Sequence, residues 1–126
     1  MTTGLEGCRV LVIEDEPLVY LALESILSDL GCEAIGVPSS LDEALDMAAS
    51  EADLSAALLD VNIWGGVVFP VAEVLKSRGV EVIFCSGMSS DDLPEQWRAA
   101  PRLQKPYGDA AVRQALTDAL ENPVLS

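Results

Sequence analysis

The chain contains three runs of apolar residues and a fourth run that is shorter and more polar. Polar residues follow each of the four runs. The runs cover residues 9–13, 56–59, 80–85 and 102–104. Successive side chains of a strand point to opposite faces, so a run with little polar alternation predicts a strand that is covered on both sides. Such strands are typical of parallel sheets. The runs therefore predict the centre of a parallel sheet.

Between these runs, apolar residues recur every three or four positions, which is the spacing of helices that bury one face. The predicted helices cover residues 17–30, 40–49, 69–78 and 92–100, with a last one after Pro106 that ends at Asn122. A short strand is predicted over residues 33–37. Pro17 suits a first helical turn, Ser40 and Glu43 have the spacing of a capping box, and Gly31 is a typical helix end.

The alternation of five strands with five helices predicts an α/β fold in which a parallel sheet carries helices on both faces. A chain of 126 residues is long enough for one well-formed core and too short for two. We therefore expect a single domain over residues 1–126, without an output domain.

The charge balance is strongly acidic. Asp and Glu number 21 against 7 Lys and Arg, which gives a net charge of -14. Nucleic acids and anionic membranes attract basic surfaces, so we expect neither as a partner. The chain also has no histidine. Histidine metal ligands and Ser-His-Asp or Cys-His catalysis are therefore excluded.

The three cysteines, Cys8, Cys32 and Cys85, lack C-x-x-C spacing and fall in or beside predicted strands. We interpret them as buried, reduced and structural. The amino-terminal residues lack a basic segment followed by an apolar one, and no apolar run reaches membrane-spanning length. We therefore expect a cytoplasmic protein.

Acidic residues follow two of the predicted strands. Glu14 and Asp15 come after the first apolar run, and Asp60 ends the second. In open α/β sheets, ligands bind at the edge where the carboxyl ends of the parallel strands meet. If these two strands are neighbours, three carboxylates gather there and repel one another unless a cation lies among them. Mg²⁺ is the natural candidate because it binds carboxylates, water and phosphate oxygens.

Asp60 ends the central apolar run, and we assign it as a phosphoryl acceptor because an aspartate can attack phosphorus and form an acyl phosphate. Glu14 and Asp15 are assigned as metal ligands. Ser86 supplies a hydroxyl donor and Lys105 a mobile positive charge, and both groups suit the equatorial oxygens of a phosphoryl group. Mg²⁺ and Lys105 together balance the three carboxylates until a phosphoryl group arrives.

With these features, the chain resembles the receiver domain of two-component response regulators over essentially its whole length. The resemblance rests on residues 12–16, 58–60, 84–87 and 103–107. It implies a flavodoxin-like fold with strand order 2-1-3-4-5. It also implies Mg²⁺-dependent transfer of a phosphoryl group to Asp60 from a sensor histidine kinase or a phosphotransfer protein. In such receivers Asp60 and the backbone carbonyl of Asn62 also bind the metal, and Ser86 and Lys105 bind the phosphoryl oxygens.

Two positions depart from the family pattern. Trp64 stands where receivers commonly have proline, and Arg102 stands where they commonly have an aromatic switch residue. In receivers, movement of the hydroxyl residue toward the phosphate lets that aromatic ring turn inward. Arg102 cannot take that part.

The expected output is binding of a protein partner, or relay or draining of phosphate. The resemblance implies a partner surface formed by the fourth helix, fifth strand and fifth helix, and we expect Arg98, Arg102 and Arg113 to give this surface local positive charge. We expect a monomer or weak dimer. The chain would not be an enzyme beyond catalysing its own phosphorylation and dephosphorylation.

Three alternative functions stay open. A degenerate receiver would bind partners without being phosphorylated. Trp64 and Arg102 keep that alternative open, whereas the intact acids, Ser86 and Lys105 argue against it. A flavin or nucleotide carrier needs a phosphate loop after the first strand, where the acidic residues 14–16 would repel phosphate. A hydrolase with an aspartyl-phosphate intermediate would carry a second acid two residues after the nucleophile, where this chain has Asn62.

Overall fold

Five parallel strands form the central sheet of the computed structural model. The structure describes residues 5–36, 38, 40–63, 66–86, 93–98, 100, 102–104 and 108–121. At positions 62, 86, 104 and 121 it describes the backbone alone. The strands are β1 (Arg9–Ile13), β2 (Glu33–Ile35), β3 (Ala56–Asp60), β6 (Glu81–Ser86) and β7 (Arg102–Gln104). Their order in the sheet is β2-β1-β3-β6-β7. This is the order 2-1-3-4-5 when the parallel strands are counted along the chain, so the predicted flavodoxin-like fold is confirmed.

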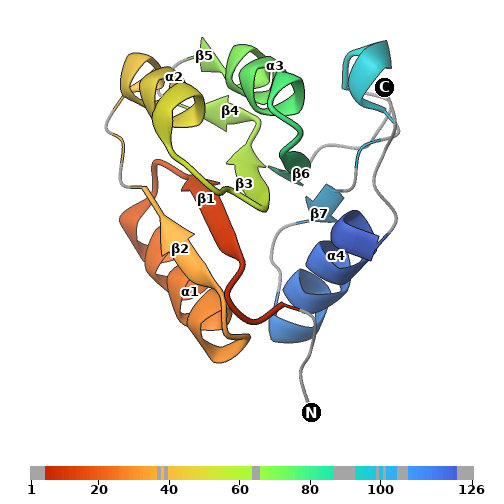
Figure 1. The fold of residues 1–126 in the computed structure, drawn as a ribbon. Coiled ribbons are helices and arrows are strands. Elements are labelled where there is room, and N and C mark those ends of the chain that lie inside the picture. Colours follow the sequence, from red (N-terminus) through yellow and green to blue (C-terminus); the bar gives the residue numbers. More distant parts are fainter. Residues whose placement is uncertain are drawn as a thin grey trace.

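Among the described residues, four α-helices cover the two faces of this sheet. They are α1 (Pro17–Asp29), α2 (Leu41–Ser50), α3 (Phe69–Ser77) and α4 (Asp109–Glu121). In Figure 1, α1 and α4 lie on one face of the sheet, and α2 and α3 lie on the other. Helices on both faces explain why the strands carry so few polar residues.

The two central strands supply both hydrophobic cores because their side chains alternate between the faces. Val12 and Leu58 belong to the core under α1 and α4, whereas Leu11 and Leu59 belong to the core under α2 and α3. All four side chains are at most 1% exposed. The middle of the sheet is therefore a rigid platform for the residues that follow β1 and β3.

The predicted helix ends are confirmed where the structure describes them. Pro17 occupies the first turn of α1, where a missing N–H leaves no intrahelical bond unmade. The Ser40 hydroxyl accepts a hydrogen bond of 3.1 Å from the backbone N–H of Glu43 at the start of α2. Gly31 follows α1 with a φ of 85°, a left-handed conformation that glycine adopts without a steric penalty.

The predicted fourth helix is wrong in both type and extent. Within the described part of residues 92–100, the only helical element is a 3₁₀ turn, η2 (Glu95–Trp97). The backbone N–H of Trp97 donates to the carbonyl of Pro94 at 2.8 Å, which closes one tight turn. Prolines at positions 94 and 101 bracket this segment, and proline disfavours helix both at its own position and at the residue before it. The segment is therefore too short for an α-helix.

A small antiparallel hairpin, which the sequence pattern did not predict, follows β3 directly. It pairs β4 (Asn62–Ile63) with β5 (Gly66–Val67). Ile63 is buried, and a Cβ atom added at Gly66 would lie only 2.7 Å from the Cδ1 atom of Leu41. Glycine therefore lets the hairpin pack closely against α2.

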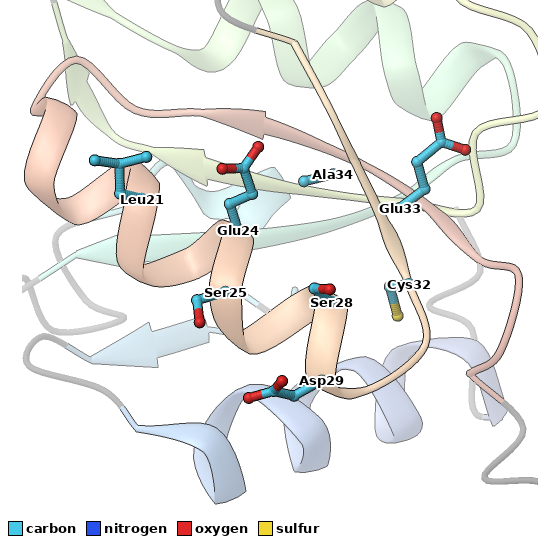
Figure 2. Close-up of a pocket in the computed structure, with 8 residues that line it drawn as sticks. All are labelled: Leu21, Glu24, Ser25, Ser28, Asp29, Cys32, Glu33 and Ala34. Atoms are coloured by element: carbon cyan, nitrogen blue, oxygen red, sulfur yellow. The ribbon is translucent and has the colours of Figure 1, made fainter.

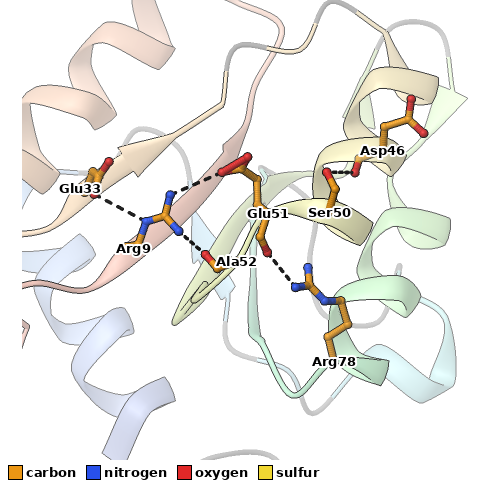
Figure 3. Close-up of polar contacts among 7 residues, drawn as sticks. All are labelled: Arg9, Glu33, Asp46, Ser50, Glu51, Ala52 and Arg78. Carbon is orange, nitrogen blue, oxygen red and sulfur yellow. Dashed lines mark hydrogen bonds and ion pairs between the residues drawn. The ribbon is translucent and has the colours of Figure 1, made fainter.

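Two arginines hold the loop between α2 and β3 at the amino ends of the strands (Figure 3). The Arg9 guanidinium forms ion pairs with Glu33 at 3.6 Å and Glu51 at 3.4 Å and donates a hydrogen bond to the carbonyl of Ala52. Arg78 donates to the carbonyl of Glu51 at 2.7 Å and to that of Ala48. These contacts fix the entry into β3 at the end of the sheet opposite the acidic residues.

None of the helices in the described ranges has the length and apolar character needed to cross a lipid bilayer.

Candidate functional site

The strand register brings the three candidate acids to one edge of the sheet. Ile13 of β1 lies opposite Leu59 of β3, so the residues that follow them, Glu14 and Asp60, leave the sheet side by side. Asp15 comes next in the turn toward α1. Two strands that are far apart in sequence therefore deliver their carboxylates to the same place, as the sequence predicted.

These side chains form a compact cluster of oxygen ligands. One carboxylate oxygen from each of Glu14, Asp15 and Asp60 lies within 4.8 Å of the other two. Glu14 is only 7% exposed, Asp60 is half-buried and Asp15 is exposed. The cluster therefore runs from the interior of the sheet edge to solvent, and a small ligand can reach it from outside.

The turn after β1 holds Glu14 in place. The backbone N–H of Glu16 donates a hydrogen bond of 3.2 Å to Oε2 of Glu14. Glu16 also precedes Pro17 at the start of α1, so the turn, the first helical residues and the buried carboxylate form one unit. Glu16 itself is exposed and is absent from the carboxylate cluster.

The donor set fits a divalent cation. Two unit charges 4.8 Å apart repel by about 0.9 kcal/mol even at the dielectric constant of water, and by more when they are closer. Two oxygens bound to one octahedral Mg²⁺ at about 2.1 Å lie roughly 3 Å apart when adjacent and roughly 4.2 Å apart when opposite. Small side-chain rotations would bring the cluster to those spacings. The three residues can therefore hold Mg²⁺ together with water and phosphate oxygens.

The backbone of two other predicted site residues, Ser86 and Asn62, is described at the ends of their strands. Asp60 is opposite Cys85 of β6, so Ser86 stands one residue further along at the same edge of the sheet. The backbone of Ser86 ends β6 and that of Asn62 begins β4, but neither side chain is among those described. Lys105, which follows β7, and Trp64 lie outside the described residues.

A chain of aromatic rings lies behind the site, and the sequence pattern did not predict it. Phe84, which is fully buried on β6, contacts Phe69 and Trp97 edge-to-face, with ring centroids 5.7 and 5.4 Å apart. Lys76 lies over the Trp97 ring, 5.2 Å from its centroid. The predicted packing role of Trp97 is confirmed by its 4% exposure. These rings connect α3, β6 and η2. Phe84, the central ring, lies two residues before Ser86.

Arg102, the other departure from the receiver pattern, lies on β7. Its Cα pairs with that of Phe84, and the residue is half-buried. Buried aromatic side chains in the described part of this region come from β6 and η2, through Phe84 and Trp97, whereas position 102 supplies a cation.

Comparison with known proteins places these features in a family, although a scan against protein-family models found no match. The phyllosphere-induced regulator PhyR of Methylorubrum extorquens is 32% identical over 115 residues, which cover 89% of this chain and 43% of PhyR. The chain thus spans less than half the length of this curated relative.

Solved structures match the chain along nearly its whole length. SdrG from Sphingomonas melonis Fr1 shares 35% identity and a TM-score of 0.79, covering 95% of this chain and 99% of SdrG. The BeF3-activated conformation of SdrG from Pseudomonas melonis Fr1 matches at 36% identity and a TM-score of 0.75, covering 89% of this chain and 95% of that chain. The REC domain of the response regulator PhyR from Erythrobacter litoralis shares 27% identity and a TM-score of 0.80, covering 98% of both chains.

The sheet order, the carboxylate cluster at the ends of β1 and β3, and these similarities agree with one another. This chain belongs to the response regulator receiver domains.

Proposed function

We propose that Asp60 accepts a phosphoryl group from the phosphohistidine of a sensor histidine kinase or a phosphotransfer protein. The observation that carries this proposal is the cluster in which oxygens of Glu14, Asp15 and Asp60 lie within 4.8 Å of one another. Asp60 is half-buried at the end of a rigid strand. Its carboxylate is therefore held in position yet open to a donor that approaches from solvent.

In the proposed reaction, an Asp60 carboxylate oxygen attacks phosphorus as the P–N bond of the donor phosphohistidine breaks. Glu14 and Asp15 would hold Mg²⁺ together with Asp60 and the backbone carbonyl of Asn62. A bound Mg²⁺ would neutralise negative charge on the cluster and on the incoming phosphoryl oxygens. The anchored position of Asp60 keeps the attacking oxygen oriented, which is the main contribution that a protein makes to phosphoryl transfer.

Ser86 and Lys105 complete the proposed site. The Ser86 hydroxyl would donate a hydrogen bond to one phosphoryl oxygen, and the Lys105 ammonium would pair with another. The register supports these roles. Ser86 follows Cys85, the residue opposite Asp60, and Lys105 follows β7, the strand next to β6. On this proposal the chain catalyses only its own phosphorylation and dephosphorylation.

The proposed output is a protein–protein contact on the surface formed by η2, β7 and α4. Arg98 and Arg113 are exposed on this surface, and Arg102 is half-buried. The protein as a whole carries a net charge of -14. Local positive charge on an otherwise acidic molecule would favour and orient a partner with acidic groups.

Mg²⁺ dependence tests the proposal. The wild-type protein is incubated with acetyl phosphate, a small acyl phosphate donor, in Mg²⁺ or in excess chelator, and its intact mass is measured after an acid quench. We expect a gain of about 80 Da, one phosphoryl group, in Mg²⁺. In chelator the phosphorylated fraction should fall at least roughly tenfold, because the carboxylate cluster would then repel the donor.

An equal mass gain in Mg²⁺ and chelator would contradict the metal role of the cluster. No gain in either condition would favour the alternative of a degenerate receiver that binds partners without phosphorylation. Calcium in place of Mg²⁺ provides a matched control, because it keeps the charge but prefers longer bonds and more ligands.

A further inference from the structure

The register of β1 and β2 brings two cysteines to opposite positions. Arg9 of β1 pairs with Glu33 of β2, and the residues just before them are Cys8 and Cys32. The backbone N–H of Glu33 donates to the carbonyl of Cys8 at 2.8 Å. In a parallel pair of strands, the carbonyl of a residue accepts from the N–H of the residue that follows its opposite neighbour. Because the carbonyl of Cys8 accepts from Glu33, the residue opposite Cys8 is Cys32.

The two thiols lie on the same face of the sheet. Cys32 belongs to the core under α1 and α4, and Cys8 packs against that same core. Neighbouring strands are about 4.8 Å apart, and the Cα atoms of disulfides lie about 4.4–6.8 Å apart. The pKa of the Cys32 thiol is raised to about 11, chiefly by burial and further by the charge of Cys8. The pair therefore has the spacing and orientation of a dithiol that a disulfide can bridge.

A glycine in the left-handed region precedes each thiol. Gly7 precedes Cys8 with a φ of 80°, and Gly31 precedes Cys32 with a φ of 85°. Both cysteines lie just before the first residue of their strands. Backbone hydrogen bonds hold them there: the N–H of Cys8 donates to the carbonyl of Leu5 at 3.1 Å, and that of Cys32 donates to the carbonyl of Leu27 at 2.9 Å. The S–S geometry is narrow and strain in it is costly, so a backbone that already holds the two cysteines opposite each other favours the bridge.

Both thiols are within reach of small molecules. Cys8 is half-buried. Cys32 is 8% exposed and lines a pocket of about 540 Å³ beside α1 and β2. Figure 2 shows Cys32 beside Ser28 of α1, with Glu24 and Asp29 on α1 and Glu33 on β2. The acidic lining favours cationic small molecules over anionic ones.

We propose that Cys8 and Cys32 form a reversible disulfide when the protein meets a small cationic disulfide. Cys8, the more exposed thiol, reacts first as its thiolate: it attacks one sulfur of the small disulfide, the S–S bond breaks and one small thiolate leaves. The Cys32 thiol then loses its proton and attacks the Cys8 sulfur, and the second small thiolate leaves. Two electrons pass from the protein to the small disulfide, which becomes two thiols.

The bridge would tie the edge strand β2 to β1 and enclose α1 in a covalent loop. It lies at the amino ends of these strands, whereas Glu14 follows the carboxyl end of β1. The site is therefore separate from the carboxylate cluster. Forming it requires the Cys32 thiol to give up its hydrogen bond of 3.4 Å to the carbonyl of Leu5.

Treatment with cystamine, a cationic disulfide, tests this proposal. The folded protein is incubated with it, quenched in acid, denatured and alkylated. We expect one alkylated cysteine in place of three and a pre-alkylation mass lower by about 2 Da, the two hydrogens lost in the bridge. Trypsin separates the thiols, because Cys8, Cys32 and Cys85 fall in peptides 1–9, 10–76 and 79–98. Peptides 1–9 and 10–76 should be linked, and dithiothreitol should release them.

Two variants identify the order of the steps. Cys32→Ala should trap cystamine on Cys8, with a mass gain of about 75 Da. Cys85→Ala is the matched control and should form the linked peptides like the wild type. Any of three results for the treated wild-type protein would overturn the proposal: three alkylated cysteines, a disulfide link through Cys85, or a stable cystamine adduct on Cys8 that Cys32 does not displace. The wild-type peptide map decides the matter even if a variant fails to fold.

Discussion

Replacing Asp60 with asparagine is expected to abolish phosphorylation by acetyl phosphate in Mg²⁺. Asparagine keeps the size of the side chain but removes the carboxylate, and an amide is neither a nucleophile toward phosphorus nor a strong ligand for a hard cation. The change therefore removes the acceptor and weakens the metal site together. We expect the phosphorylated fraction to fall at least about a hundredfold, as measured by intact mass.

Asp29→Asn is the matched control for this prediction. It makes the same chemical change at an exposed residue at the end of α1, outside the carboxylate cluster. The control should be phosphorylated like the wild type, and the thermal unfolding midpoints of both variants should confirm that they are folded. Wild-type phosphorylation of Asp60→Asn would show that the acceptor lies elsewhere.

Replacing Phe84 with alanine is expected to lower the free energy of unfolding by about 3–5 kcal/mol. Phe84 is fully buried and contacts the rings of both Phe69 and Trp97. Alanine would leave a cavity between α3, β6 and η2 and would remove both edge-to-face contacts, which add to the loss of buried area. Urea unfolding followed by far-UV circular dichroism measures this change.

Phe84→Leu separates the two contributions. Leucine keeps most of the buried apolar volume but removes the aromatic contacts, so its destabilisation should be less than half that of alanine. A loss below about 1 kcal/mol for alanine would contradict the placement of Phe84 at the centre of this core. Trp97 fluorescence should also change in the alanine variant, because one neighbouring ring is removed.

The sequence predicted the parallel sheet because its central strands carry an unmistakable signal. Val12 and Leu58 face one core while Leu11 and Leu59 face the other, so both faces of the strands had to be apolar. Local chemistry also predicted the helix starts at Pro17 and Ser40, since those positions depend on single residues and their near neighbours.

Elements that depend on few residues or on distant contacts were missed. The β4–β5 hairpin has two residues in each strand, which is too short for any periodic pattern. The close approach of Gly66 to Leu41 is a tertiary contact that no local pattern reports. The predicted fourth helix was wrong because residues 92–95 were interpreted as a helix start, whereas the prolines at positions 94 and 101 favour a short turn.

The same distinction between local patterns and tertiary contacts applies to the functional groups. The clustering of Glu14, Asp15 and Asp60 could be predicted because strand ends in parallel sheets meet at one edge. The Cys8–Cys32 pair could not, because it depends on the register between β1 and β2, and shifting that register by one residue would separate the thiols.

Binding of beryllofluoride, a stable analogue of the phosphoryl group, tests the central claim that Asp60 and its neighbouring acids form a Mg²⁺-dependent phosphoryl site. Fluorine NMR is recorded on wild-type protein with beryllofluoride and Mg²⁺, after addition of chelator, and on the Asp60→Asn and Asp29→Asn variants. We predict protein-bound fluorine signals that saturate at one equivalent in the wild type and in Asp29→Asn, and that vanish in chelator and in Asp60→Asn. The absence of bound signals from folded wild-type protein in Mg²⁺, or their persistence in Asp60→Asn, would contradict the claim.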